Sequence, residues 1–203
     1  MRAGPAFFAS TGPVVWNPAD KAAEVSLSNG NLTATRSGGG VNNNAAVRGT
    51  TSKNSGKSYF EIHVDTSVGS ASGDYSIYGI ASAALGLNAY VGSTAASYGY
   101  EHSTGVKYTN GSGTALGAAL AAGDVLGVAV DLDAGKMWFA KNNTWQGSGN
   151  PGAGTNPAFT GVSGTFYPAA SLYKTATTQH VLTARFAPGI LSYSPPSGFS
   201  AWE

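Results

Sequence analysis

Two acids and a histidine on one short segment are the first candidates for chemistry. Glu61, His63 and Asp65 alternate with three apolar residues between positions 59 and 65. Residues two apart on a β-strand share a face, so these three side chains point the same way. A retaining glycosidase needs two carboxyl groups about 5 Å apart. The E-x-D-x-x-E spacing typical of such enzymes on β-sandwiches is absent, which favours an ordinary polar, solvent-facing strand over a glycosidase.

A second pair of acids could bind Ca²⁺. Asp131 and Asp133 begin a D-x-D-x-G pattern. In an EF-hand loop, however, a third polar ligand would stand at Gly135 and a bidentate glutamate at Asn142. Since both are missing, we expect a hairpin turn in which the aspartates accept hydrogen bonds from nearby backbone N–H groups.

Other signatures of catalysis are missing from the sequence. The histidines at positions 63, 102 and 180 lie on separate elements without metal-ligand spacing, and the chain has 0 cysteines. There is no G-x-S-x-G nucleophile elbow. The G-x-G-x-x-G match at 147–152 contains Pro151 and precedes no helix that could bind a phosphate. We therefore expect no metal, no cofactor and no enzymatic activity.

Aromatic residues in or beside loops are the strongest functional signal. Tyrosine and tryptophan combine a large contact area with a polar group, which favours binding surfaces. Tyr98 and Tyr100 lie in an S-Y-G-Y segment that resembles a known family motif, so we expect them to pack in the core. The remaining candidates for binding are Tyr90, His102, Tyr108 and Trp145.

Short strands must position all of these residues, and the stretch 123–145 organises them. Val125 to Leu132 is a nearly unbroken apolar run, typical of a strand buried on both faces. Turn residues follow at 133–135, and 137–140 resumes as a second strand with aromatic bulk. The stretch therefore predicts a central β-hairpin.

The rest of the chain alternates between short strands and Gly-rich turns. A hairpin is predicted at 25–36 around the Asn29-Gly30 turn, and further strands at 59–65, 75–82, 166–173 and 180–186. Residues 83–94 could form a short helical turn or an irregular loop. No segment keeps a helical period over three turns, so we expect an all-β fold, a two-sheet antiparallel β-sandwich.

Composition narrows the range of partners. Of the 203 residues only 10% are charged, against roughly 25% in average soluble domains. The net charge of +1 gives no basic face for nucleic acid. No apolar run reaches the ~18 residues of a membrane span. A weakly charged surface gives little repulsion between copies, which favours a homo-oligomer or a particle-associated protein.

Several segments resemble, in order, the motifs of the SPRY (B30.2-like) family. They are Lys57–Glu61, Tyr78–Ser82, Ser97–Tyr100, the G-D-V-L-G, D-L-D-A-G and W-F-A-K-N runs between 123 and 142, Phe166–Leu172 and Ala184–Phe186. The resemblance covers roughly 16–202 and implies a concanavalin-like jelly roll that binds ligands through loops at one end. Ala187-Pro188 departs from the family pattern, and the loops do not match residue by residue. The sequence around Trp16-Asn17-Pro18 most resembles that of SPRY domains in bacteriophage gene products.

These observations predict two parts. Residues 1–15 would form an N-terminal arm, and 16–203 the SPRY-like domain. The arm is either a frayed terminus or a strand tucked onto the sandwich, which is favoured, or a docking segment that anchors Phe7 and Phe8 on a neighbouring subunit. We expect a non-enzymatic binding or assembly module, a bacteriophage virion structural protein of the decoration or fibre type. It would be located in the virion, with other virion proteins as partners. The alternative is an adhesin or lectin-like module that recognises a host glycan or protein through its loops.

Overall fold

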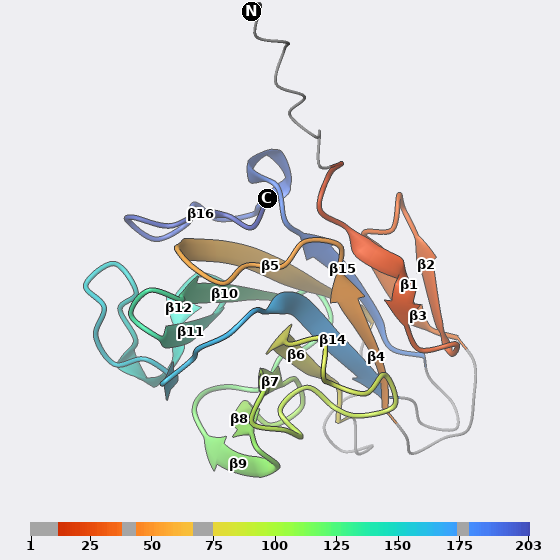
Figure 1. The fold of residues 1–203 in the computed structure, drawn as a ribbon, viewed down its shortest axis with the longest axis horizontal. Coiled ribbons are helices and arrows are strands. Elements are labelled where there is room, and N and C mark those ends of the chain that lie inside the picture. The colour runs from red at the N-terminus through yellow and green to blue at the C-terminus, as the bar shows by residue number, and fades with distance from the viewer. Residues whose placement is uncertain (1–11, 38–43, 67–74, 174–178) are drawn as a thin grey trace, which may run out of the picture.

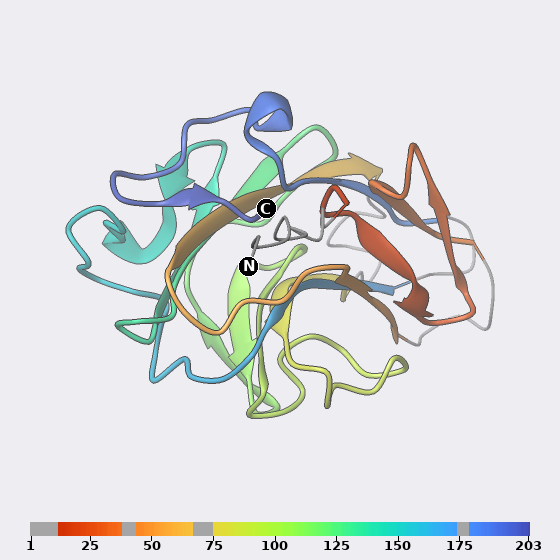
Figure 2. The ribbon, with the colours of Figure 1, turned by 45° about the horizontal axis from the view of Figure 1, so that its top comes forward.

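The computed structural model describes residues 12–37, 44–66, 75–173 and 179–203. Two β-sheets face each other around one core, which confirms the predicted all-β sandwich (Figures 1 and 2). All pairings between neighbouring strands are antiparallel except that of β16 with β5. In the described part the only helices are two 3₁₀ turns, Gln146–Ser148 and Pro188–Ile190.

Each sheet mixes strands from distant parts of the chain. Sheet A has the order β1 (Trp16–Lys21), β4 (Asn44–Gly49), β14 (Tyr167–Tyr173), β6 (Ile77–Ala81), β7 (Ser97–Glu101), β8 (Val106–Thr109) and β9 (Ser112–Ala115). Sheet B has the order β12 (Thr144–Trp145), β11 (Lys136–Lys141), β10 (Val125–Asp131), β5 (Lys57–Thr66), β15 (Val181–Arg185), β3 (Thr33–Arg36) and β2 (Val25–Ser28). Two short strands join sheet B: β13 (Phe159–Thr160) on β11 and β16 (Ser200–Ala201) on β5.

The predicted central hairpin is confirmed as β10 and β11. Val128 pairs with Phe139 on the face turned to sheet A, and Ala129 pairs with Trp138 on the opposite face. Both faces of β10 are covered, because one contributes to the core and the other lies under the C-terminal segment. Double burial is the reason that its sequence reads as a continuous apolar run.

The outer face of each sheet is partly covered by a long connection (Figure 2). On sheet B the segment after β15 packs Leu191 and Phe199 against Tyr59 and Trp138. On sheet A the connection from β6 to β7, residues 82–96, packs Leu85 and Val91 on the sheet. This connection is an irregular loop, which decides the alternative left open for 83–94.

The expected turn at Asp131 and Asp133 is confirmed. Asp131 Oδ1 accepts a hydrogen bond from the Ala134 amide at 2.9 Å, and Asp133 Oδ1 accepts one from the Gly56 amide at 2.9 Å. The second bond joins the turn to the segment that precedes β5. Both carboxylates therefore stabilise loops.

The expectation of a solvent-facing strand around Glu61 is wrong for Glu61 itself. His63 is half-buried and Asp65 is exposed, and their side chains bond each other at 2.7 Å. Glu61 is fully buried, because the C-terminal segment crosses its face of β5. Its two oxygens accept hydrogen bonds from the amides of Ser192 and Tyr193 at 2.7 and 2.9 Å. Strand periodicity cannot show that a distant segment will cover a polar face.

Asp124 joins the loop before β10 to the turn after β11. Its carboxylate accepts hydrogen bonds from the Ala121 amide and Asn142 Nδ2 at 2.8 and 2.6 Å, and pairs with Lys141 at 2.9 Å. Burial alone would raise the pKa of Asp124. The hydrogen bonds and the charge of Lys141 outweigh burial and lower this pKa below its ordinary value of 3.8.

Asp124→Asn is expected to lose about 1 kcal/mol of unfolding free energy at neutral pH. Since the folded-state pKa is lowered, the stabilisation is complete above pH 3.8 and disappears as the pH falls through the folded-state value. Urea denaturation of wild type and variant over a pH series measures this. The difference between the two should shrink below pH 3.8; a difference that does not change with pH would contradict this role for the carboxylate.

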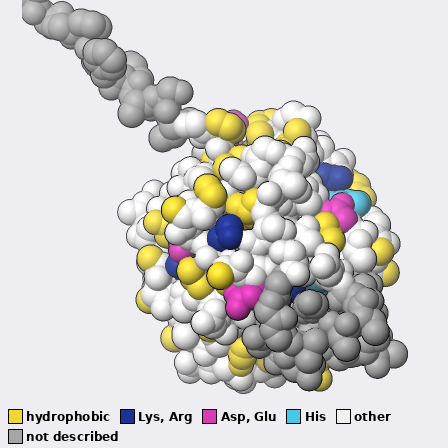
Figure 3. All heavy atoms as spheres, turned by 90° about the vertical axis from the view of Figure 1, so that its right-hand side faces the viewer, with side chains coloured by type: hydrophobic (Ala, Val, Ile, Leu, Met, Phe, Trp, Pro, Cys, Tyr) yellow, Lys and Arg dark blue, Asp and Glu magenta, His cyan; other side chains and the backbone are white. Residues whose placement is uncertain are grey.

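Two short strands lie close to turns. Ser112 begins β9 directly after the turn at Asn110 and Gly111, and β12 follows the turn at Asn142 and Asn143. The arm residues Phe7 and Phe8 lie outside the described residues. The face in Figure 3 carries few charged side chains, as the composition implies. Among the described residues, no helix has the length and apolarity to span a bilayer.

Candidate binding site

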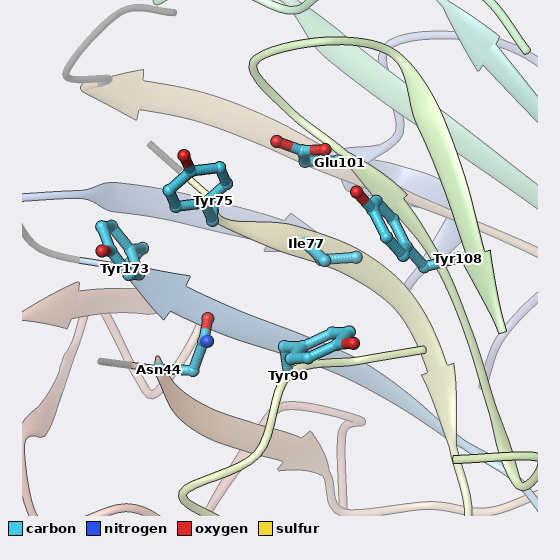
Figure 4. A pocket seen from close by; sticks show the side chains of 7 residues that line it. All are labelled: Asn44, Tyr75, Ile77, Tyr90, Glu101, Tyr108 and Tyr173. Atoms are coloured by element: carbon cyan, nitrogen blue, oxygen red, sulfur yellow. The ribbon is translucent and has the colours of Figure 1, made fainter. Parts of the chain in front are cut away.

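A pocket of about 220 Å³ opens on the outer face of sheet A, beyond the part that the loop 82–96 covers. Figure 4 shows its side chains, which are mainly tyrosines arranged around an apolar base with one carboxylate at the edge. The lining residues are Asn44, Tyr75, Ile77, Tyr90, Glu101, Tyr108 and Tyr173.

Strand register brings most of these residues together. Asn44, the first residue of β4, pairs with Tyr173, the last residue of β14. Ile77, the first residue of β6, pairs with Glu101, the last residue of β7. Four neighbouring strands of sheet A therefore begin or end at the pocket, and Tyr108 joins from β8. The pocket depends on the order of strands in the sheet.

Tyr90 reaches the pocket from the loop 82–96, and two hydrogen bonds anchor the backbone that directly follows it. The Val91 amide donates to Ser171 Oγ at 3.1 Å, and the Gly92 amide donates to Ser97 Oγ at 2.9 Å. A Cβ at Gly99 would lie 2.9 Å from the Val91 carbonyl oxygen, so the missing side chain lets the loop backbone approach β7.

The tyrosines form two edge-to-face pairs. The ring centroids of Tyr75 and Tyr173 are 5.2 Å apart at an interplanar angle of 88°, and those of Tyr90 and Tyr108 are 6.0 Å apart at 81°. Such contacts fix ring orientation. Tyr75 is 52% exposed, unusual for a ring of its size, and is therefore available to a partner.

The carboxylate of Glu101 is 2% exposed and is held in place by hydroxyl groups. Ser103 Oγ donates to one oxygen at 2.9 Å, and Thr104 Oγ1 donates to the other at 2.8 Å. Burial, followed by the charge and hydrogen bond of Glu101, raises the pKa of the Tyr108 hydroxyl. That hydroxyl therefore stays protonated and remains a donor at neutral pH.

The structure brings together two of the four predicted binding residues, Tyr90 and Tyr108. Trp145 lies elsewhere, on sheet B, with its ring 6.3 Å from that of Tyr59. His102, also predicted as a binding residue, does not lie at the surface. Its ring is fully buried, with its centroid 5.0 Å from that of His180. The alternation that turns Tyr98 and Tyr100 into the core continues through His102.

Sequence reasoning missed Asn44, Tyr75, Glu101 and Tyr173. The alternation of strand side chains between the two faces of a sheet could have placed two of them, Glu101 and Tyr173, on the outer face. Once Tyr98 and Tyr100 are assigned to the core, Glu101 must face outwards, and the same holds for Tyr173 beside the buried Leu172. Their convergence depends on the neighbouring positions of β4, β14, β6 and β7, which no local pattern contains.

The described residues offer no metal centre. No group of three or more His, Asp or Glu side chains that could hold a metal lies within 12–37, 44–66, 75–173 and 179–203. The pocket contains a single carboxylate, whereas acid–base hydrolysis of a glycoside uses a pair. Its chemistry is suited to contact with a partner.

Comparison with known proteins identifies the fold and the family. The family model for the SPRY domain matches residues 57–185. The chain belongs to the SPRY domain family. The crystal structure of the SPRY domain of human HERC1 superposes with a TM-score of 0.66 at 17% identity, over 84% of this chain and 96% of that one. The sandwich described above is therefore a SPRY fold.

The curated relatives of this SPRY domain include two animal proteins. Ran-binding protein 9 of Xenopus laevis and Ran-binding protein 10 of Danio rerio are each 29% identical over 165 residues. The match covers 79% of this chain but only 28% and 25% of those proteins. The SPRY resemblance is thus confirmed, whereas these relatives give no support to a bacteriophage origin. SPRY domains are protein–protein interaction modules. Because the chain belongs to this family, it is a protein–protein interaction module at this general level.

Proposed function

We propose that this SPRY domain binds a protein partner by inserting a side chain of that partner into the tyrosine-lined pocket of sheet A. One observation carries the proposal: four tyrosines from four separate segments converge on a single pocket with an exposed edge. Tyrosine is enriched at the energetic centres of protein interfaces. Ordered rings around a cavity reduce the entropy lost on binding.

Peptides selected from a random library on the immobilised domain provide the test. Tyr90→Ala is expected to weaken binding of the selected peptides by at least about tenfold, because truncating an interface anchor costs about 2 kcal/mol or more. Calorimetry or fluorescence anisotropy measures this affinity. The thermal unfolding of the variant, recorded in parallel, verifies that it is folded.

Trp145→Ala is the matched control, since it truncates a half-buried aromatic residue on the other sheet. We expect it to leave peptide affinity unchanged. If Trp145→Ala alone removed binding, the docking surface would lie on sheet B. If neither variant changed affinity, both surfaces would be excluded.

A virion role and an adhesin or lectin-like role are narrower proposals. The first is supported by the low content of charged residues, 10%, and by Phe7 and Phe8 in the arm 1–15. The second is supported by the tyrosines of the pocket, since aromatic rings also stack on sugars. A defined oligomer in light scattering of the full-length chain would support the virion role. Retention of a glycan, lost in Tyr90→Ala, would support the lectin-like role.

A further inference from the structure

We infer that the pocket of sheet A takes one cationic side chain, the guanidinium of an arginine or the ammonium of a lysine, from the protein partner. The inference rests on the proposed function, since it names the chemistry of the group that the pocket would accept. Three features carry it: the aromatic walls, the buried carboxylate and a buried acceptor without a partner.

The aromatic walls are placed to surround a cation. Tyr75 and Tyr173 stand on one side of the pocket, and Tyr90 and Tyr108 on the other (Figure 4). The face of an aromatic ring carries negative electrostatic potential and attracts a cation within about 6 Å of the ring centroid. Several tyrosines around one small cavity therefore favour a positive guest.

The carboxylate of Glu101 supplies the negative charge. Its described hydrogen-bond partners are hydroxyl groups, and within the described ranges no lysine, arginine or histidine forms an ion pair with it. Lys107, the nearest lysine in sequence, donates to the Ala158 carbonyl and lies over the ring of Phe159. A carboxylate removed from water without a counter-charge is unfavourable. A cation in the pocket would provide that counter-charge.

Asn44 supplies an acceptor on the opposite side of the pocket. Its Oδ1 is buried and has no hydrogen-bond partner, and Figure 4 shows the amide across the pocket from Glu101. A buried acceptor left unbonded is rare and destabilising, so it points to a donor that arrives with a ligand. An ammonium offers three N–H donors and a guanidinium five, and neither is an acceptor.

Size and charge limit the choice of guest. At about 220 Å³ the pocket is smaller than the several hundred Å³ typical of drug-sized ligand sites, and it fits a single side chain. A neutral apolar guest would leave Asn44 Oδ1 and Glu101 without a new partner. An anionic guest would be repelled by Glu101. A basic side chain satisfies the rings, the carboxylate and the amide together.

NMR titration of the whole chain with capped amino acids tests the inference without a protein partner. The probes are Nα-acetyl-arginine methylamide and Nα-acetyl-lysine methylamide. Their neutral counterparts are the citrulline and Nε-acetyl-lysine analogues. We expect the cations to bind with millimolar affinity and the neutral analogues at least about tenfold more weakly, a difference of ~1.4 kcal/mol. The tighter cation identifies the preferred side chain, and equal affinity of the charged and neutral forms would overturn the inference.

Two matched pairs of variants locate the effect. Glu101→Gln removes the charge, keeps an acceptor oxygen for one of the two hydroxyls of Ser103 and Thr104 and places an NH2 donor beside the other, and we expect about tenfold weaker binding of the cations. Glu203→Gln makes the same change of charge at the exposed C-terminal residue and should leave affinity unchanged. Tyr75→Leu should weaken binding several-fold, whereas Tyr75→Phe keeps the ring and should weaken binding much less than Tyr75→Leu.

The outcomes separate this inference from the proposed function. If the cations fail to bind but library peptides still depend on Tyr90, the pocket binds proteins through other chemistry and the inference fails alone. If peptide binding is also independent of Tyr90, both fail. Should Glu101→Gln not fold, the comparison of charged and neutral probes on wild type and the Tyr75 variants still decides the question.

Discussion

Glu61→Ala is expected to lower the free energy of unfolding by about 3 kcal/mol and the melting temperature by about 10 °C. The fully buried carboxylate accepts hydrogen bonds from the Ser192 and Tyr193 amides and from the Tyr59 hydroxyl, the last at 3.0 Å. Removing it breaks the two part-buried amide hydrogen bonds and leaves the buried Tyr59 hydroxyl without its acceptor, and an unsatisfied buried polar group costs about 1–3 kcal/mol. Arg185, 3.6 Å away, would also lose its ion-pair partner.

Denaturant unfolding measures this loss, and hydrogen exchange locates it. The amides of Ser192 and Tyr193 should exchange much faster in Glu61→Ala, because the C-terminal segment is tied to β5 there. Glu203→Gln serves as the surface control and should stay within about 0.5 kcal/mol of wild type. Binding of cations at the pocket should persist in Glu61→Ala, since the two sites lie on different sheets. A stability loss below about 1 kcal/mol would show that this carboxylate does not hold the segment.

Arg48→Met is expected to lower the unfolding free energy by about 3 kcal/mol and to weaken peptide binding at the pocket. The buried guanidinium bonds Asp20 through Nε and Nη2, at 2.7 and 2.6 Å, and donates to the Leu85 carbonyl at 2.6 Å. The last bond fixes the start of the loop that carries Tyr90. Without it the loop should become less ordered, and part of the binding energy would be spent on ordering it.

A double-mutant cycle with Asp20→Ala provides the control. Asp20→Ala alone leaves the buried Arg48 guanidinium without its counter-charge. We expect it to lower the unfolding free energy by about 2–3 kcal/mol, less than for a fully buried pair because the Asp20 side chain is 27% exposed. The double variant should lose clearly less than the sum of the two single changes, because neither charge is then left unpaired. Additive losses would show that the pair does not act as a unit. Peptide affinity should fall more in Arg48→Met than in Asp20→Ala, since only the former removes the bond to Leu85.

Local patterns were sufficient wherever a strand and its turn are neighbours in sequence. The apolar run at 125–132 and the aromatic return strand predicted the β10–β11 hairpin, and the Asn29-Gly30 turn predicted the β2–β3 hairpin. Burial on both faces requires a continuous apolar run, and a tight turn requires residues that tolerate positive φ. Asn29 and Gly30 have φ of 52° and 62°.

Burial of polar residues was harder to predict. Periodicity shows on which face of a sheet a side chain lies, but not which other segment covers that face. Glu61 was assigned correctly to the face opposite Phe60, yet that face is closed by residues more than a hundred positions later. His102 was treated as a loop residue, whereas it continues the inward alternation of Tyr98 and Tyr100. Both errors concern the environment of a side chain, which depends on segments distant in sequence.

By itself the sequence determined the fold class, the central hairpin, the membership of the SPRY family and two tyrosines of the pocket, Tyr90 and Tyr108. These follow from alternation, turn chemistry, the order of motifs and aromatic residues beside loops, all of which can be read along the chain without knowing which strands pair. Only the tertiary structure decided that the two tyrosines meet Tyr75, Tyr173, Glu101 and Asn44 around one cavity. The reason is physical: the cavity exists because β4, β14, β6 and β7 are neighbours in sheet A, and these pairings join residues as far apart as Asn44 and Tyr173.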